Sequence, residues 1–199
     1  MTWMITARGE QVDLRCIDPE RLRIDDVAHH LALSNRWTGA TCRPYSVAEH
    51  SLLVDEILQR EHGVTSPSVL LAGLLHDAHE AYTGDLSTPM KAIIGDAWYT
   101  EERRIQVALQ RRFDLLTPSA AFAELIHRAD LQALACEWRD LVGMAHLMPP
   151  SLPAAPGWVR LQERAGMGWR DWQQAFLDRF AELVYFRAEQ ATDKRTVWQ

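Results

Sequence analysis

The sequence is short of cysteine and of long apolar runs. Its three cysteines, Cys16, Cys42 and Cys136, are odd in number and show no C-x-x-C spacing. This pattern excludes a disulfide framework and a zinc ribbon, and it is typical of a reducing compartment. No apolar run approaches the roughly 18 residues needed to span a membrane, and residues 1–10 lack the apolar core of a signal peptide. We therefore expect a cytoplasmic protein without a membrane partner.

Positive charge is also scarce, because the formal net charge is −6 at pH 7. Proteins that bind long nucleic acid need a basic face, so this balance argues against such a partner. A small anionic substrate fits only if cations are placed locally beside it. What the chain does have is an ordinary globular composition, with 47% hydrophobic and 24% charged residues over 199 positions. That length suits a single well-buried domain covering residues 1–199.

Helix signals dominate the rest of the chain. Ser46 opens an S-x-x-E capping box, and three prolines follow a Ser or Thr in the arrangement of a helix N-cap and first helical position. Residues 3–6 and 11–14 flank a glycine turn and resemble a short hairpin. The sequence therefore predicts an all-α fold with a short N-terminal β-hairpin. The main helices are expected at about residues 46–62, 67–83, 97–113, 117–142 and 169–190.

Charged side chains interrupt the apolar helix expected over residues 67–83. Glu80 is four residues after His76 and three after Asp77, and residues three and four apart share one face of a helix. The three polar groups are therefore expected to converge on one side of a buried helix. A buried charge needs a partner or a metal, so this stretch predicts either a functional site or a satisfied polar network.

Further potential ligands lie on other predicted helices. His50 is on the helix that begins near residue 46, and Asp130 is on the helix that begins near residue 117. Facing helices of a bundle commonly supply metal ligands in this way. Together with His76 and Asp77, they offer two imidazoles and two carboxylates. Such a set suits Mn²⁺, Fe²⁺, Co²⁺, Ni²⁺ or Zn²⁺ better than Ca²⁺ or a thiolate-loving ion.

Several motifs accompany this H…HD…D skeleton within about residues 25–140. They are Asn35-Arg36-Trp37, residues 46–51, 75–80 and 83–91, and Ala129-Asp130. With these motifs the sequence resembles the HD-domain metal-dependent phosphohydrolases, which are all-helical. More narrowly, it is similar to the bacterial 5'-deoxynucleotidase branch and to the related small dNTP triphosphohydrolases. The resemblance implies an HD-type helical bundle that forms one phosphohydrolase domain.

The resemblance also implies roles for individual residues. One divalent transition metal would be held by His50, His76, Asp77 and Asp130, and the resemblance leaves open a second metal such as Mg²⁺. Glu80 would be the general acid or base that acts on the attacking water. Asp85 would act near the sugar hydroxyl or the water network.

Three more residues would contact the substrate. Arg36 would bind the phosphate next to the bond that breaks, Trp37 would stack on or enclose the sugar and base, and Lys91 would contact phosphate. An arginine suits bidentate phosphate recognition. It would also supply the local positive charge that a nucleotide needs in an acidic protein.

The implied reaction is hydrolysis of deoxynucleoside 5'-monophosphates to deoxynucleoside and phosphate, with a metal-bound hydroxide as nucleophile. A first alternative is a dNTP triphosphohydrolase, acting for example on dATP, in which Lys91, Arg43 and Arg128 would hold the outer phosphates. A second alternative is a regulatory nucleotide-binding module without turnover. A homodimer or higher homo-oligomer is expected from the resemblance alone.

Simpler structural interpretations stand beside these roles. Glu80 could orient a ligand histidine, and Arg36 could pair with a surface carboxylate. Trp37 could belong to the core, and Asp85 could cap a turn.

Other charged residues are expected to be solvated or structural. His79 and His127 are interpreted as satisfied or solvent-facing histidines, with ligation of a second metal as the alternative. Glu137 and Asp140 are interpreted as solvated helix charges. The same interpretation applies to the charges of the helix at residues 97–113, which are Glu101, Glu102, Arg103, Arg104, Arg111 and Arg112.

Overall fold

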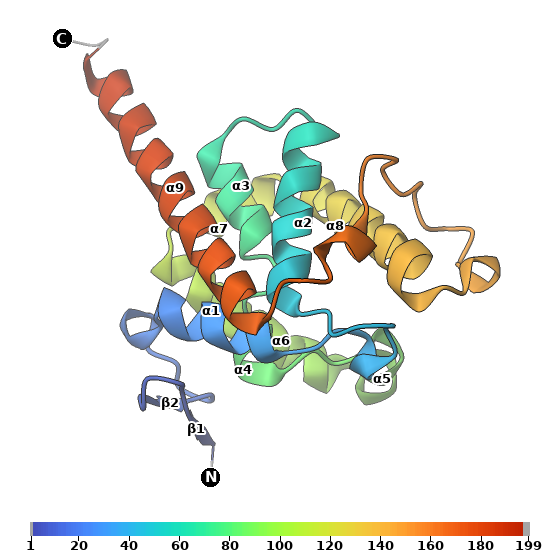
Figure 1. Cartoon of the computed structure of the whole chain (residues 1–199). Helices are drawn as coiled ribbons and strands as arrows, with labels where there is room; N and C mark the ends of the chain where they lie inside the picture. Colours follow the sequence, from blue (N-terminus) through green and yellow to red (C-terminus); the bar gives the residue numbers. More distant parts are fainter. Residues whose placement is uncertain (1, 197–199) are drawn as a thin grey trace.

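The computed structural model describes residues 2–196. This part of the chain is an all-α fold with a two-stranded antiparallel hairpin at its N-terminal end (Figure 1). The hairpin consists of β1 (Trp3–Ile5) and β2 (Gln11–Asp13). The α-helices are α1 (Ile24–Leu33), α2 (Val47–Arg60), α3 (Pro67–Leu74), α4 (Glu80–Thr83), α5 (Thr88–Ile94), α6 (Asp96–Arg112), α7 (Leu116–Ala121), α8 (Ala123–Glu137) and α9 (Trp169–Thr196). The predicted fold class, including the hairpin, is confirmed.

A histidine fastens the hairpin to the helices. Nε2 of His30, on α1, accepts a hydrogen bond of 3.0 Å from Ala7 N, which lies in the hairpin turn. Nδ1 of the same ring lies 2.7 Å from Ala81 O of α4 and donates to it. Both ring nitrogens are therefore used in structure, and α1 links the hairpin to the helix that carries Glu80.

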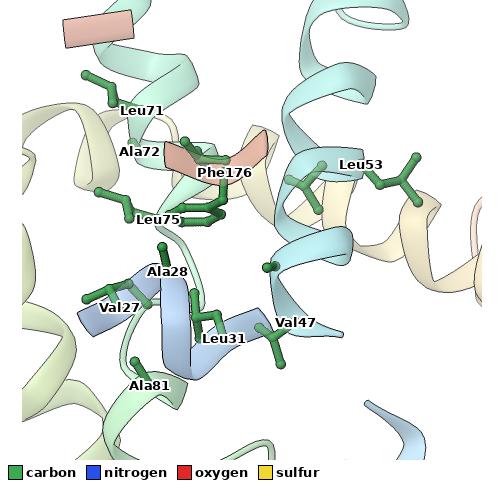
Figure 2. Packing of buried hydrophobic residues seen from close by; sticks show 14 of the residues in the cluster. Val27, Ala28, Leu31, Val47, Leu53, Leu71, Ala72, Leu75, Ala81 and Phe176 are labelled. Atoms are coloured by element: carbon green, nitrogen blue, oxygen red, sulfur yellow. The ribbon is translucent and has the colours of Figure 1, made fainter. Parts of the chain in front are cut away.

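Helix α9 covers the core formed by the earlier helices. It packs against α1, α2 and α3, and α2 packs in turn against α3 and α8 (Figure 1). Phe176 of α9 is completely buried, and Figure 2 shows its ring next to Ala72 and Leu75. Of the helices in the described part of the chain, none has the length and apolar character needed to cross a membrane.

Helices α2 and α3 approach each other closely at Gly73. A Cβ atom added to Gly73 would lie 2.3 Å from Cδ1 of Leu58, which is too short for a non-bonded contact. Glycine therefore lets α3 pack directly against α2. Because α2 carries His50 and the end of α3 leads to His76, this contact sets the spacing between the two histidine-bearing segments.

Helix α2 begins where the sequence predicts it. The Ser46 hydroxyl accepts a hydrogen bond of 3.1 Å from Glu49 N, which satisfies an amide that the helix leaves free. The Glu49 side chain does not complete the capping box, because it pairs with Arg43 at 2.7 Å. Arg36 N donates to Tyr45 O at 2.9 Å, so the loop that carries Arg36 is attached to the start of α2.

The predicted continuous helix through residues 67–83 is wrong. Helices α3 and α4 are separated by residues 75–79, which form turns. Nδ1 of His76 donates to Gly73 O at 2.8 Å, and this carbonyl would accept from Asp77 N in a continuous helix. His76 thus occupies this carbonyl with its ring and, at 3.3 Å, with its backbone N–H in place of Asp77 N. The chain turns where the two candidate ligands lie.

The helix predicted over residues 117–142 is also divided. Helices α7 and α8 meet at Phe122, whose φ of −117° and ψ of 20° are not helical. Residues 138–142 form a π-helical turn directly after α8. The helices predicted at 46–62 and 97–113 are confirmed as α2 and α6, within a few residues at their ends.

Candidate metal centre

Four side chains meet between α2, α8 and the turn at residues 75–79. His50 comes from α2, His76 and Asp77 from the turn, and Asp130 from α8. Nε2 of His50 lies 3.3 Å from Nε2 of His76 and 3.1 Å from Oδ1 of Asp130. Oδ2 of Asp77 lies 3.7 Å from the His50 nitrogen and 3.2 Å from the His76 nitrogen. Segments far apart in the sequence thus place their polar atoms in one small cluster.

These separations fit a metal ion. Ligand atoms that lie about 2.1 Å from a shared ion are roughly 3 to 3.5 Å from one another, and the measured separations run from 3.1 to 3.8 Å. His50, His76 and Asp130 form a candidate metal-ligand group, and Asp77 lies beside them. Two imidazoles and two carboxylates match a divalent transition metal.

A hydrogen bond at the other ring nitrogen orients each ligand histidine. Nδ1 of His76 donates to Gly73 O at 2.8 Å, and Nδ1 of His50 donates to the Glu137 carboxylate at 2.6 Å. A proton on Nδ1 leaves a lone pair on Nε2, and Nε2 is the atom that faces the cluster in both rings. Such hydrogen bonds fix the tautomer of metal-ligating histidines.

Glu137 is the residue of this site that sequence reasoning missed. The prediction of a solvated Glu137 is wrong, because its side chain is completely buried. Its Oε2 accepts from Nε1 of Trp37 at 2.8 Å and from Nε of Arg36 at 3.3 Å, while Oε1 accepts from His50. Glu137 is seven residues after Asp130, and two helical turns place both on one face of α8. This spacing is the feature of the sequence that could have identified Glu137 as part of the site.

Arg36 and Trp37 reach the site from the loop before α2. The Arg36 side chain is 12% exposed, and its NH1 lies 3.6 Å from Oδ2 of Asp77. The Trp37 ring packs edge-on against Trp138 with 5.2 Å between ring centroids. Trp37 and Thr38 have positive φ angles of 59° and 51°, which are unfavourable for residues with a side chain. Such strain persists only where surrounding contacts hold it, and here the indole hydrogen bond is one of them.

Glu80 lies at the start of α4, beside the cluster. Its side chain is buried, and its Oε2 has no hydrogen-bond partner among the described residues. Its Oε1 lies 3.9 Å from Nζ of Lys91. Burial raises the pKa of Glu80 to about 9, and the carboxylates of Asp77 and Asp85 add to the rise. A buried oxygen without a partner can accept a hydrogen bond from a bound water or ligand.

Carboxyl groups outnumber arginine and lysine side chains at the site. The cations among the described residues are Arg36 and Lys91, and Lys91 is also bound to Glu102 at 2.6 Å. Burial raises the pKa of Asp85, although the charges of Arg36 and Lys91 work against the rise. A divalent cation would compensate the negative charge of the carboxylates that are ionised. The carboxylates of the site are Asp77, Glu80, Asp85, Asp130 and Glu137.

The histidines and carboxylates of the cluster favour each other's charged forms. Burial works against a charged His76, but Asp77 and Asp130 raise its pKa well above its usual value. Burial also works against a charged Asp77, but His76 holds the pKa of that carboxyl well below its usual range. A metal ion that binds here therefore competes with a proton on the histidine pair.

His79 has partners of its own. It is buried, and its Nε2 lies 3.0 Å from the Glu102 carboxylate. Gln106 accepts a hydrogen bond of 3.1 Å from its backbone N–H. The prediction of a satisfied histidine is confirmed. His79 also forms a second candidate metal-ligand group with Asp77 and Glu80.

Of the other predictions about charged residues, some are wrong and one is confirmed. The prediction of a solvated Glu102 is wrong, because α6 directs it toward His79 and Lys91. Asp140 is not a solvated charge either, since it accepts a hydrogen bond of 3.0 Å from Leu161 N. His127 is exposed, as predicted, with Nδ1 3.8 Å from Oδ2 of Asp130.

Two relatives match most of the chain. The uncharacterized protein RCAP_rcc00048 of Rhodobacter capsulatus is 37% identical over 146 residues, which are 72% of this chain and 74% of that protein. The chain belongs to the family of this Rhodobacter protein. The uncharacterized protein YfdR of Escherichia coli K12 is 29% identical over 141 residues, which are 71% of this chain and 73% of that protein. No protein-family model matches the sequence.

A cavity borders the cluster in this member of the family. It has a volume of about 460 Å³ and is lined by His76 and His79 on one side and by α6 and α7 on the other. Gln110 and Ser119 add polar groups to its wall. A small polar ligand can therefore reach the edge of the cluster formed by His76.

Proposed function

We propose that the protein is a metal-dependent phosphohydrolase that releases phosphate from deoxynucleoside 5'-monophosphates. The observation that carries the proposal is the cluster of His50, His76, Asp77 and Asp130, with the buried carboxyl of Glu80 beside it. The donor set and its spacing suit a divalent transition metal. The same residues carry the H…HD…D pattern, and the all-α fold agrees with the resemblance to HD-domain phosphohydrolases.

Hydrolysis of a phosphate ester needs an activated water and compensation of phosphoryl charge. A bound divalent ion supplies both, because it lowers the pKa of its water to about 7 and neutralises negative charge. Glu80 would hold the attacking water through its unpartnered Oε2, and its carboxylate form, favoured by Lys91, Arg36 and a bound cation against the effect of burial, would take up the proton. Lys91, 3.9 Å from the other Glu80 oxygen, would stabilise the carboxylate form of Glu80 between turnovers.

Arg36 is placed to bind the phosphoryl oxygens. Its Nε is held by Glu137 at 3.3 Å, and its NH1 lies 3.6 Å from a candidate metal ligand, Asp77. Burial works against its charge, but the surrounding carboxylates, Glu137 first, raise its pKa and keep it cationic. A positioned guanidinium binds phosphate with two parallel hydrogen bonds. Arg36 would thus hold the phosphate next to the ligand cluster.

The distribution of cations supports a monophosphate substrate over a triphosphate. Arg43, one candidate for the outer phosphates, is held by Glu49 and by Leu161 O at 2.7 and 2.8 Å. Arg128 lies exposed on α8, and Lys91 is shared with Glu102. The outer phosphates of a dNTP would therefore find few free cations near the cluster.

Product analysis tests the proposal. The protein is stripped of metal, reloaded with Co²⁺ or Mn²⁺, and offered dAMP and dATP separately, with the other bases as controls. We expect inorganic phosphate from the monophosphates and none from dATP. Release of triphosphate and deoxynucleoside from dATP would contradict the monophosphate assignment and support the dNTP triphosphohydrolase instead. No turnover of either nucleotide, with metal bound, would contradict the assigned substrate class.

A further inference from the structure

A second cavity lies between α6 and the loop that follows β2. It has a volume of about 610 Å³, and the residues that line it include no acidic side chain. Four of them are arginines: Arg15 from the loop, and Arg103, Arg104 and Arg111 from α6. In a chain with a net charge of −6, such a concentration of cations marks a local site for an anion.

The helical repeat of α6 explains how the cavity is separated from the metal-ligand cluster. Thr100, Arg104 and Arg111 are spaced by multiples of about one turn, so they form one stripe that faces the cavity. Glu102 and Gln106 lie about half a turn away from that stripe, where they contact Lys91 and His79. The stripe that faces the cavity is therefore turned away from the cluster, although Arg103 and Val107 also line the smaller cavity beside His76.

Most of the arginine charge in the cavity is free to bind a ligand. The guanidinium groups of Arg15, Arg103 and Arg111 form no ion pair and donate no hydrogen bond within the described residues. Arg104 differs, because its Nε donates to Glu101 at 3.0 Å. Three guanidinium groups are thus available in a space that opens to solvent.

Two acids, Asp13 and Glu101, lie beside arginines that line the cavity. The carboxylate of Asp13 accepts a hydrogen bond from Arg15 N at 2.9 Å, and this bond is the main reason that its pKa is lowered. The charges of Arg104 and Arg15 lower it further. Even with Asp13 and Glu101 included, the arginines outnumber the acids at this cavity.

The remaining lining indicates the class of anion. Ile17, Pro19 and Val107 form an apolar wall beside the arginines. Guanidinium groups bind phosphates and stack on aromatic bases, and the volume lies within the range of about 300–1,000 Å³ that is typical of small-molecule sites. A ligand with several negative charges and an apolar ring uses both parts of the lining. We propose that this cavity binds a nucleoside triphosphate, at a site separate from the metal-ligand cluster.

Calorimetric titration with ATP in the presence of EDTA tests the proposal. Because no divalent ion is available, this binding measurement does not depend on the proposed phosphohydrolase activity. We compare the wild type with Arg15→Ser/Arg111→Ser, which removes two free cations from the cavity. The matched control is Arg23→Ser/Arg170→Ser, which removes two exposed arginines that do not line the cavity. Unchanged thermal unfolding midpoints show that each variant is folded.

We expect the wild type and the control variant to bind ATP alike, and the cavity variant to bind roughly tenfold to a hundredfold more weakly, because charge-assisted hydrogen bonds are lost. Equal binding by the cavity variant, or no binding by the wild type, would overturn the proposal.

Two further measurements test which site binds the nucleotide and which part of the nucleotide is recognised. Asp77→Asn alters the metal-ligand cluster, so ATP binding should remain as in the wild type; its loss would place the nucleotide at that cluster and overturn the proposal. Inorganic triphosphate should bind more weakly than ATP, because it cannot use the apolar wall. Equal affinity for both would overturn the nucleoside part of the assignment.

Discussion

The carboxylate of Glu137 accepts a hydrogen bond of 2.6 Å from Nδ1 of His50, and both side chains are completely buried. The two residues are 87 positions apart in the sequence. Burial works against the charge of Glu137, but Arg36 and His50 lower its pKa below the usual value. One carboxylate therefore orients a candidate metal ligand and holds both Arg36 and Trp37.

Replacing Glu137 should weaken metal binding without touching a ligand. In Glu137→Gln the amide keeps the volume but loses the charge that orients the His50 ring. Substitutions of this kind lower metal affinity by about 10- to 100-fold, and we expect that range in a Co²⁺ titration. Glu124→Gln, an exposed acid of the same helix, should bind Co²⁺ like the wild type. An unchanged affinity in Glu137→Gln would contradict this role.

Replacing Glu80 should affect turnover while metal binding remains. Glu80→Gln keeps the side-chain volume but cannot take up a proton, and loss of a positioned acid or base costs about 10²- to 10⁴-fold in rate. Steady-state phosphate release from the best monophosphate, with Co²⁺ occupancy measured on the same sample, checks this expectation. A wild-type rate at full occupancy would remove Glu80 from the catalytic machinery.

The stability of the protein should depend on pH through Asp55. This carboxylate of α2 is buried against Arg179 of α9 at 2.7 Å, and burial raises its pKa to about 6 although Arg179 opposes the rise. The folded state therefore binds this proton more tightly than the unfolded state, whose Asp pKa is about 3.9. Its contribution is fully present below about pH 4 and is lost as the pH rises through about 6.

Asp55→Asn isolates this effect, because it has no proton to lose. Between pH 4 and 7 the free energy of unfolding of the wild type should fall relative to the variant by up to about 3 kcal/mol. Urea unfolding at several pH values in this range measures the difference. Parallel pH profiles for the two proteins would show that Asp55 titrates normally.

The contact between α2 and α3 should not tolerate a side chain at residue 73. The Cβ atom of Gly73→Ala would overlap Leu58 of α2, and overpacking of this kind costs about 1–3 kcal/mol. Because Leu58 is completely buried and has no free space to turn into, we expect this cost to exceed the roughly 1 kcal/mol that alanine gains over glycine in a helix. We expect a lower free energy of unfolding by denaturant titration.

Leu58→Ala supplies the matched control for the close contact. Alone it should destabilise by about 2–5 kcal/mol, because it leaves a cavity. Combined with Gly73→Ala, it removes the atom that the new Cβ would strike. The double variant should therefore be more stable than the sum of the single effects predicts, and strict additivity would show that the two residues do not meet.

Local sequence patterns were sufficient to predict most helices and the types of residue that could bind a metal. The capping serine of α2 and the Ser66-Pro67 start of α3 depend on residues close in sequence, so they could be predicted without the fold. The break between α3 and α4 could not, because it depends on His76 taking a carbonyl that a regular helix would use. Adjacent residues of a helix point about 100° apart, and the turn is what brings His76 and Asp77 to the same point.

The sequence by itself determined the all-α class, the positions of most helices and the residue types that suit a divalent metal, because these follow from periodicity, capping and side-chain chemistry. Only the tertiary structure decided which atoms meet. The packing of α2 on α8 buries Glu137 against His50, and α6 places the half-buried Glu102 within hydrogen-bonding distance of His79. Both acids look solvated in the sequence, because burial depends on segments that are distant along the chain.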